Sequence, residues 1–331
     1  MGYKLLFLPK KGVLSMAKKT YRVRNWKEYN KGLVNRGSLT FWFSDEIQKN
    51  WQKNENSTAQ GNQKYSDDII LCSLTLRQIF GLPLRATQGL MGSLGELAKL
   101  NVNIPDYSTL SRRSKTVKVN FDIKKNLKAR HILIDSTGIR VIGEREWKKL
   151  HHGENGRQLW RKLHIAMDAD THEILAATMT ESVRLDGNYL PELIDKIDGP
   201  IDQITGDGAY DKKNCYQTAY KRGAKAVFPP QHDACVQRNK IKKDQALMAR
   251  DATILFINNG EDVKMRRKLW KIENNYHRRS LVETMMSRMK SIFGDEMRSR
   301  TIENQYTDLM IRCNIINKMN LLGMPKSEQI D

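Results

Sequence analysis

The chain has 331 residues with 57 Lys+Arg against 37 Asp+Glu, which gives a formal net charge of +20 at pH 7. A hydrophobic content of 39% is typical of a folded protein and excludes a disordered one, whose sequence could not bury enough apolar surface. No stretch approaches the roughly 20 apolar residues of a membrane span, so we expect a cytoplasmic protein that does not insert into a membrane. The excess of basic residues predicts a polyanionic partner, and we therefore expect the protein to be associated with the nucleoid.

Residues 1–63 are expected to form a basic N-terminal segment and a linker. Pro9, Lys10 and Lys11 interrupt the apolar letters near the start, which argues against a signal peptide, and Met16 is an alternative start. Aromatic and basic residues are mixed between residues 21 and 43, and this favours core packing over stacking on bases. Residues 52–64 are polar and predict a linker. The four cysteines are widely spaced and predict neither a zinc site nor a disulfide framework.

Residues 64–125 are predicted to be a helical DNA-binding domain. Ser66 is a good N-cap for a first helix, which Gly81 and Pro83 end. Two shorter helices are expected at residues 84–93 and 93–100.

A further helix is expected with its N-cap at Ser108 or Thr109 and with Arg112 and Arg113 in the following turns. Short helices that end in a basic one resemble a helix-turn-helix module, in which these two arginines would bind DNA. A helical bundle with a solvated basic face explains the same pattern equally well.

From residue 130 the pattern changes to strands. Apolar runs predict strands at residues 132–134, 163–167 and 173–179, then a helix at 189–197, a strand at 203–205, a helix at 212–222, a strand at 224–228 and terminal helices. This order predicts an α/β fold with a ribonuclease-H-like mixed sheet and flanking helices over residues 126–322, followed by a tail at 323–331.

Two aspartates follow short apolar strands of this predicted sheet. Asp135 comes after residues 132–134, and Asp207 comes after residues 203–205. Ends of neighbouring strands lie close together, and hard divalent cations prefer carboxylate oxygens. A lone Asp at a strand end is usually a turn residue or a helix cap, so these two residues alone prove little.

A more specific pattern lies near the C-terminus, where Tyr276, Arg279, Glu283 and Lys290 are spaced at offsets of three, four and seven residues. On one continuous helix these side chains would share a single face. An ordinary amphipathic helix with an Arg279–Glu283 ion pair explains part of the pattern, but not the presence of Tyr and Lys on the same stripe.

The spacing Y-x2-R-x3-E-x6-K resembles the signature of the Y-R-E-K branch of the DDE transposases of bacterial insertion sequences. The segments ILIDSTG, GDGAYD, YSDDIILCSLTLRQIFGLPLRATQG and IPDYSTLSRR are similar to segments of the insertion sequence 5 family. The resemblance extends from about Tyr21 to Leu322.

The resemblance implies a transposase with Asp135, Asp207 and Glu283 as the catalytic, metal-binding triad. It also implies two Mg²⁺ or Mn²⁺ ions, binding of terminal inverted repeats and target DNA, strand cleavage and transfer, and a homodimer on DNA. Tyr276, Arg279 and Lys290 would hold the DNA strand. The alternatives are a junction resolvase of the same fold and a DNA-binding protein that has lost catalytic activity.

Other polar residues carry weaker hypotheses. His164 is more typical of a hydrogen-bonded sheet histidine than of a ligand, and Trp270 is more typical of packing than of stacking on an unpaired base. Asp168 and Asp170 fit a hairpin turn. A phosphate-facing role for His151 and His152 has no further support.

Overall fold

A mixed β-sheet forms the centre of the molecule. The computed structural model describes residues 20–55, 65–121, 123, 128–142, 159–237, 244–260 and 262–330. The strands are β2 (Arg130–Val141), β3 (Leu159–Asp168), β4 (Ile174–Glu181), β5 (Ile201–Thr205), β6 (Lys225–Val227) and the short β7 (Glu296–Met297). Their order is β4-β3-β2-β5-β6, and β7 also pairs with β2. β2, β3 and β4 are antiparallel, whereas β5, β6 and β7 run parallel to their partners. The predicted mixed sheet is therefore confirmed, and β7 is a strand that the sequence did not predict.

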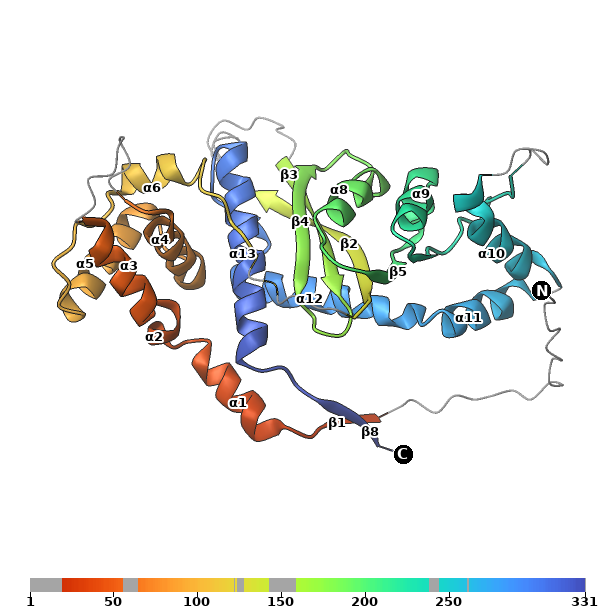
Figure 1. The fold of residues 1–331 in the computed structure, drawn as a ribbon, viewed down its shortest axis with the longest axis horizontal. Helices are drawn as coiled ribbons and strands as arrows, with labels where there is room; N and C mark the ends of the chain where they lie inside the picture. The colour runs from red at the N-terminus through yellow and green to blue at the C-terminus, as the bar shows by residue number, and fades with distance from the viewer. Residues whose placement is uncertain are drawn as a thin grey trace, which may run out of the picture.

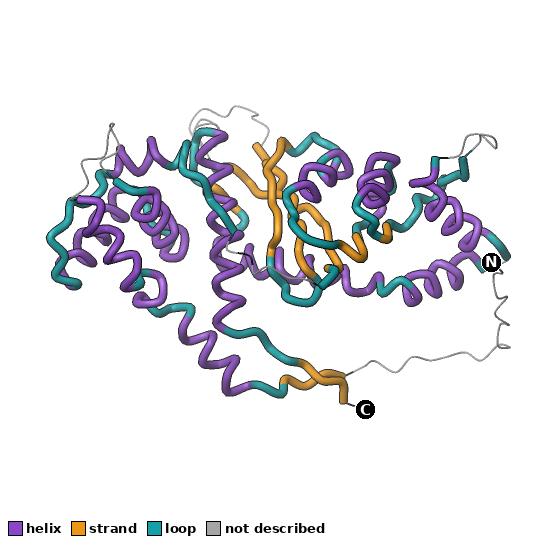
Figure 2. Tube along the Cα trace, in the orientation of Figure 1, coloured by secondary structure: helices purple, strands orange, loops and turns teal. Residues whose placement is uncertain are grey.

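Helices cover both faces of this sheet (Figures 1 and 2). Leu133 and alternate residues of β2 and β3 pack in one core with α12 (Ser280–Phe293) and α13 (Ile302–Leu322). Ile132 and Ile134 point to the opposite face, where they pack in a second core with α8 (Leu190–Asp195) and α9 (Lys213–Lys221). Successive side chains of a strand point to opposite faces, so a strand with both faces covered has an unbroken apolar run. This explains the run at residues 132–134.

Helix α13 contributes to two cores. Its residues Leu309 and Cys313 belong to the core against the sheet, whereas Ile311 and Ile315 belong to a core with the N-terminal helices. A helix that is buried on all sides has no single apolar stripe. Its buried Asn317 donates to the carbonyl oxygen of Ile174 (2.8 Å) and accepts from the same residue's amide (2.7 Å). The polar residues of α13 thus join it to the edge strand β4.

The N-terminal third is helical. Its helices are α1 (Trp26–Asn35), α2 (Leu39–Trp42), α3 (Asp45–Glu55), α4 (Asp67–Phe80), α5 (Leu84–Leu97) and α6 (Tyr107–Arg113). The prediction of two helices over residues 84–100 is wrong, because α5 continues through residue 93 without a break. The predicted cap of α6 is also wrong: the cap is Asp106, two residues before Ser108, and its side chain accepts from the amide of Ser108 (2.7 Å).

Aromatic residues of the N-terminal segment divide into two groups. Trp42 is buried in the core shared with α4 and α13, as the core interpretation predicts, and Trp51, beyond the segment of that prediction, is buried in the same core. Tyr21 and Trp26 are 62% and 56% exposed, so packing does not explain them. Helix α3 extends into the predicted linker as far as Glu55, and residues 56–64 lie outside the described residues. The division of residues 1–125 into two units stays a prediction.

The two ends of the described chain pair with each other. Strand β1 (Thr20–Val23) is antiparallel to β8 (Ser327–Ile330), so the predicted tail at 323–331 contains a strand. The ribbon lies at the end of α1 and α13, away from the sheet (Figure 1). A Cβ on Gly32 of α1 would lie 2.7 Å from the carbonyl oxygen of Leu322, so glycine permits the close approach of these two helices.

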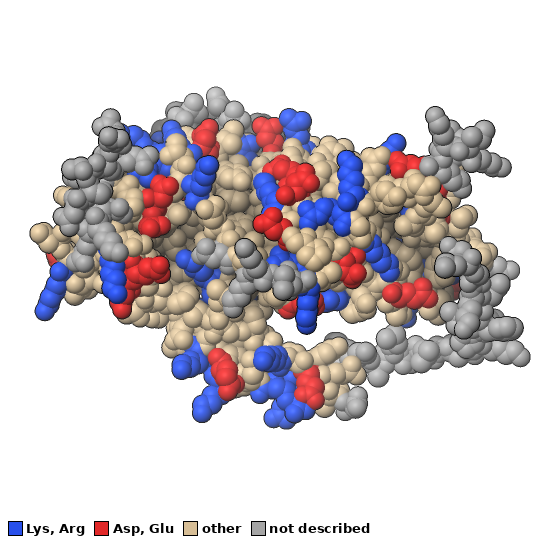
Figure 3. Space-filling view, viewed as in Figure 1, with Lys and Arg blue, Asp and Glu red and all other residues tan. Residues whose placement is uncertain are grey.

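Two more helices, α10 (Met248–Asn258) and α11 (Val263–Glu273), follow β6 and precede α12 in the chain. They lie at the end of the molecule opposite the N-terminal helices (Figure 1). Short 3-10 turns η1 (Asp186–Asn188), η2 (Gly208–Tyr210), η3 (Gln245–Leu247) and η4 (Tyr276–Arg279) complete the elements. Among the described residues no single helix is long and apolar enough to cross a membrane; α4 and α5 pass that test only as a joined pair, which is bent by 113°. Figure 3 shows basic and acidic side chains interspersed on one face of the molecule.

Candidate active site

Asp135 lies in the interior of β2, not at its end as predicted. β2 continues to Val141 because its pairing with β3 continues to Leu159. The carboxylate of Asp135 accepts from the amide of Ser136 (2.8 Å), and 14% of its side chain is exposed. Burial raises the pKa of Asp135, and the neighbouring carboxylates of Asp207 and Glu283 add to this effect, while the Ser136 amide and Arg279 oppose it.

Asp207 reaches the same place from the neighbouring parallel strand. The ladder between β2 and β5 ends at the pair Leu133–Thr205, so Asp135 and Asp207 each follow this last pair by two residues. Asp207 then caps the turn η2, because its side chain accepts from the amide of Ala209 (2.9 Å). The parallel pairing of β2 and β5 thus brings together two aspartates that lie 72 positions apart in the sequence.

Glu283 comes from α12, whose apolar side packs on the sheet through Val282, Met285, Met286 and Met289. Glu283 is one residue beyond Val282 and has 51% of its side chain exposed. The amphipathic pattern of α12 therefore presents the glutamate on the side that the core does not occupy.

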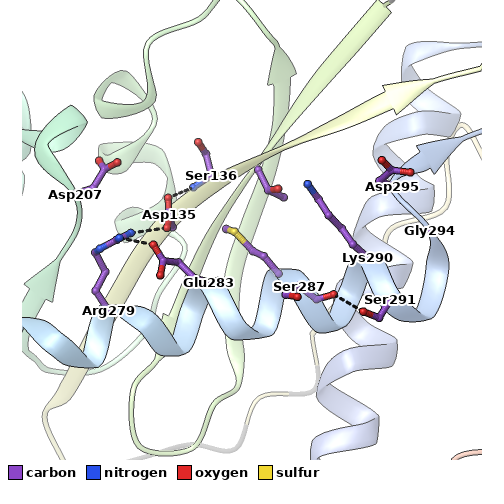
Figure 4. Close-up of a pocket in the computed structure, with 12 residues that line it drawn as sticks. Asp135, Ser136, Asp207, Arg279, Glu283, Ser287, Lys290, Ser291, Gly294 and Asp295 are labelled. Atoms are coloured by element: carbon purple, nitrogen blue, oxygen red, sulfur yellow. Dashed lines mark hydrogen bonds and ion pairs between the residues drawn. The ribbon is translucent and has the colours of Figure 1, made fainter. Parts of the chain in front are cut away.

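The three carboxylates line one cavity of about 770 Å³ (Figure 4). Its lining consists of Asp135, Ser136, Thr137, Asp207, Arg279, Glu283, Met286, Ser287, Lys290, Ser291, Gly294 and Asp295. All three residues of the predicted triad are in this set, with two of the three predicted strand-holding residues, Arg279 and Lys290. The sheet and α12 together thus build a cleft with acidic and basic side chains.

A guanidinium bridges two of these carboxylates. Arg279 Nη1 lies 2.7 Å from Asp135 Oδ2, and Arg279 Nη2 is paired with Glu283 Oε1 (Figure 4). The predicted pair between Arg279 and Glu283 is therefore present, and Asp135 is a second partner. A planar guanidinium can donate to two carboxylates at once, which a lysine ammonium does with less geometric definition.

Two family models, both described as a transposase DDE domain, match residues 34–144 and 126–318. The second match alone covers more than half of the chain. The chain belongs to the DDE transposases.

The transposase is also similar to two solved structures at low identity. One is a piggyBac transposase in a synaptic complex with hairpin DNA, with 11% identity, a TM-score of 0.38, and coverage of 91% of this chain and 76% of that chain. The other is the Drosophila P element transposase in a strand transfer complex, with 11% identity, a TM-score of 0.31, and 83% coverage of each chain.

The donor chemistry of the transposase cavity suits a hard divalent cation, since Asp135, Asp207 and Glu283 all supply carboxylate oxygens. Among the residues that the structure describes, however, no three His, Cys, Asp or Glu side chains lie close enough together to hold a metal ion. The ligand types fit, and Arg279 pairs with two of the three candidate ligands, Asp135 and Glu283.

Tyr276 is placed differently from its prediction. Tyr276 and Arg279 belong to the 3-10 turn η4, and the α-helix begins only at Ser280. The prediction of one continuous helix from Tyr276 is therefore wrong. Tyr276 does not line the cavity; its ring packs on Trp270 at 6.0 Å and lies 5.9 Å from the guanidinium carbon of Arg279. It contacts the cavity through Arg279.

Arg112 and Arg113 of the transposase lie on α6 and have different surroundings. Arg113 donates to the carbonyl oxygen of Tyr65 (2.8 Å) and pairs with Asp67, and only 14% of its side chain is exposed. Arg112 is exposed and donates to Thr109 Oγ1 (3.2 Å). Arg113 thus has partners inside the fold, whereas Arg112 faces solvent.

The weaker candidates fall outside the cavity. His164 is fully buried, shares a hydrogen bond of 2.9 Å with Thr180 Oγ1 and stacks on Tyr189. Trp270 is 6% exposed. Both positions agree with structural roles. His151 and His152 lie outside the described residues.

The hairpin between β3 and β4 accounts for the other two aspartates. Asp168 Oδ1 accepts from the amides of Asp170 (2.8 Å) and Thr171 (3.3 Å), as expected for a turn. Asp170 pairs with Arg278 at 2.6 Å. These contacts agree with the turn interpretation.

Sequence reasoning missed part of the cavity lining, above all Asp295 and the pair Ser136 and Thr137. Ser136 and Thr137 directly follow Asp135, and this adjacency was a usable signal. Asp295 had no such signal: it reaches the cavity because the following residues, Glu296 and Met297, form β7 beside β2. A two-residue strand leaves no periodic pattern in the sequence.

Proposed function

We propose that this transposase belongs to an insertion sequence of the insertion sequence 5 family, Y-R-E-K branch, and that it binds the terminal inverted repeats, cleaves the DNA strand there and transfers the freed end into target DNA. The observation that carries the proposal is the convergence of Asp135, Asp207 and Glu283 on one cavity that Arg279 and Lys290 also line. A cleft that contains both carboxylates and cationic side chains suits phosphoryl transfer on a phosphodiester.

Asp135, Asp207 and Glu283 are the proposed metal ligands. DDE transposases use divalent metal ions, and we propose two Mg²⁺ or Mn²⁺ ions here. Such ions, when bound, lower the pKa of a water or hydroxyl nucleophile and stabilise the oxygen that leaves. Glu283 reaches the cavity from α12, so movement of this helix relative to β2 would change the spacing of the ligands.

Lys290 and Arg279 are the proposed contacts to the DNA backbone. Both line the cavity on the α12 side, where they lie within reach of a strand that passes the carboxylates. Arg279 can bind a phosphate through two nitrogens, whereas Lys290 supplies a point charge. Tyr276 would act through its contact with Arg279.

Residues 64–125 are proposed as the DNA-binding domain and residues 126–322 as the catalytic domain, with Arg112 as the better placed of the two α6 arginines. The net charge of the whole chain, +20, supports a DNA partner. Cutting at two ends in step requires a dimer on DNA, and a protein with this partner would be found with the nucleoid.

Glu283→Gln tests the proposal. The variant keeps the size of the side chain and removes the charge that a divalent cation needs, so cleavage of a duplex from the DNA flanking the coding sequence should be abolished while binding persists. Glu273→Gln is a matched control, since Glu273 ends α11 and does not line the cavity. Cleavage at the wild-type rate by Glu283→Gln contradicts the triad. Strand cleavage without transfer in the wild-type protein favours a resolvase instead.

A further inference from the structure

The guanidinium of Arg279 occupies the position between two proposed metal ligands. Its Nη1 contacts Asp135 Oδ2 at 2.7 Å and its Nη2 contacts Glu283 Oε1. The contacts join β2, the turn η4 and α12, and only 19% of the Arg279 side chain is exposed. The guanidinium therefore offsets part of the negative charge of Asp135 and Glu283.

Arg279 and a divalent cation compete for the same two carboxylates. Mg²⁺ requires oxygen ligands at roughly 2.0–2.1 Å in an octahedral arrangement. The guanidinium already takes one oxygen of each carboxylate, and its positive charge repels a second cation beside it. Pairing with Arg279 therefore weakens the binding of a metal ion by Asp135 and Glu283.

Arg279 has an alternative partner when DNA enters the cavity. A phosphate accepts two hydrogen bonds from one guanidinium, as a carboxylate does. The cavity of about 770 Å³ is large enough to admit the backbone of a strand beside Arg279 and Lys290. The ring of Tyr276, 5.9 Å from the guanidinium carbon, offers a surface along which Arg279 can turn away from Asp135.

We propose that Arg279 is a positioning residue that exchanges partners: it holds Asp135 and Glu283 in the free protein, and it releases them to a divalent cation when a DNA phosphate takes its guanidinium. This inference rests on the proposed function, because it takes Asp135 and Glu283 as metal ligands. Binding of DNA and of metal are then coupled, and by linkage each strengthens the other by the same factor. The free protein binds metal weakly, so the carboxylates do not act before an end is in place.

Mn²⁺ binding to the protein without DNA, followed by calorimetry, tests the exchange. Arg279→Gln removes the competitor, so it should bind Mn²⁺ at least about tenfold more tightly than the wild type, within the usual range of coupling between two sites. Lys290→Gln is the matched control: it removes the same charge from the same cavity but does not free either carboxylate. It should change Mn²⁺ binding only a few-fold. Arg279→Lys keeps the charge but not the contact with both carboxylates, so its Mn²⁺ affinity should lie between that of Arg279→Gln and that of the wild type.

A second measurement uses a duplex from the DNA flanking the coding sequence. This duplex should tighten Mn²⁺ binding to the wild type and leave Arg279→Gln almost unchanged. Equal Mn²⁺ affinities for Arg279→Gln and Lys290→Gln overturn the exchange. The double variant Arg279→Gln, Glu283→Gln separates this failure from failure of the triad: it should lose the gained affinity, and retention of that affinity shows that Glu283 is not a ligand.

Melting temperatures give a readout that needs neither DNA nor activity. Without metal, Arg279→Gln leaves the carboxylates of Asp135 and Glu283 without their guanidinium partner, so it should melt below the wild type. Added Mn²⁺ should raise its melting temperature more than that of the wild type. An equal rise in both proteins overturns the exchange, and Arg279→Lys provides the same comparison with a smaller initial loss of stability.

Discussion

Arg250 of α10 and Asp211, four residues after Asp207, form a two-point ion pair, with Arg250 Nε 2.6 Å from Asp211 Oδ1 and Nη2 3.1 Å from Oδ2. The Asp211 side chain is 1% exposed and also accepts from the hydroxyl of Tyr216 (3.1 Å). Helix α10 is therefore held to the segment that carries Asp207, one of the proposed metal ligands.

Arg250→Ala should destabilise the protein strongly, because it leaves the buried Asp211 carboxylate without its cation. Loss of one partner of a buried pair costs about 3–5 kcal/mol in free energy of unfolding. Urea denaturation measures this change. Lys264→Ala, an exposed position on α11, removes the same charge and should stay within about 0.5 kcal/mol of the wild type. A similar small effect for Arg250→Ala contradicts a structural role of the pair.

Gly206→Ala should disturb the placement of Asp207. A Cβ at Gly206 would lie 2.7 Å from Tyr210 Cδ2, 3.0 Å from Tyr210 Cγ and 3.3 Å from Phe228 Cδ1. Both rings are buried and cannot move aside freely, so overpacking should cost about 1–3 kcal/mol in stability and lower the cleavage rate.

Gly208→Ala is the control for this substitution. A Cβ at Gly208 meets only the carbonyl oxygen of Pro229 at 3.5 Å, an ordinary contact. Its stability and cleavage rate should remain near those of the wild type. Equal effects of the two alanine substitutions, measured by denaturation and by cleavage, are inconsistent with a steric role for Gly206.

Arg112→Ala and Arg113→Ala should separate DNA binding from folding. Arg113 donates to a backbone carbonyl and pairs with Asp67, so Arg113→Ala should lower the free energy of unfolding by about 1.5–3 kcal/mol. Arg112 is exposed, so Arg112→Ala should keep stability and weaken DNA binding.

The salt dependence of DNA binding provides the readout for Arg112. If Arg112 neutralises one phosphate, its removal should reduce the slope of log affinity against log salt by about 1. An unchanged slope between about 50 and 200 mM salt would mean that α6 does not present Arg112 to DNA.

Acid should destabilise the fold through His164. Burial, the largest cause, lowers the pKa of His164 to about 4; Asp186 opposes this shift and Lys162 adds to it. Between about pH 6.5 and 4, His164 is protonated in the unfolded chain but neutral in the folded protein. The free energy of unfolding therefore has its full value above about pH 6.5 and decreases as the pH falls through this window. The loss amounts to about 3 kcal/mol at most.

Denaturation of the wild type and of His164→Asn at several pH values measures this contribution. Asn carries no titratable proton, so the variant should lose less stability between pH 6.5 and 4 than the wild type does. His131, whose pKa burial also lowers to about 4, would still contribute a slope in the variant. Parallel pH curves for the two proteins would falsify the assignment to His164.

The sequence by itself determined the order of the strands and helices from residue 130 onward. The strands have apolar runs, such as residues 132–134, because both faces of the sheet are covered, and the helices have caps and amphipathic patterns. It also indicated which acidic residues to compare, since Asp135 and Asp207 follow such runs and Glu283 lies among the apolar positions of α12. These features depend on neighbours within a few residues, which is the range over which a sequence pattern carries information.

Only the tertiary structure decided how the candidate site is assembled. The parallel pairing of Leu133 with Thr205 places Asp135 beside Asp207, and β7 brings Asp295 to the same cavity. The partner of Asp135 is likewise a long-range fact: Arg279 reaches it from a 3-10 turn 144 positions away. Strand register and side-chain direction arise from packing between distant segments, so no local pattern could show that a guanidinium lies between two of the three carboxylates.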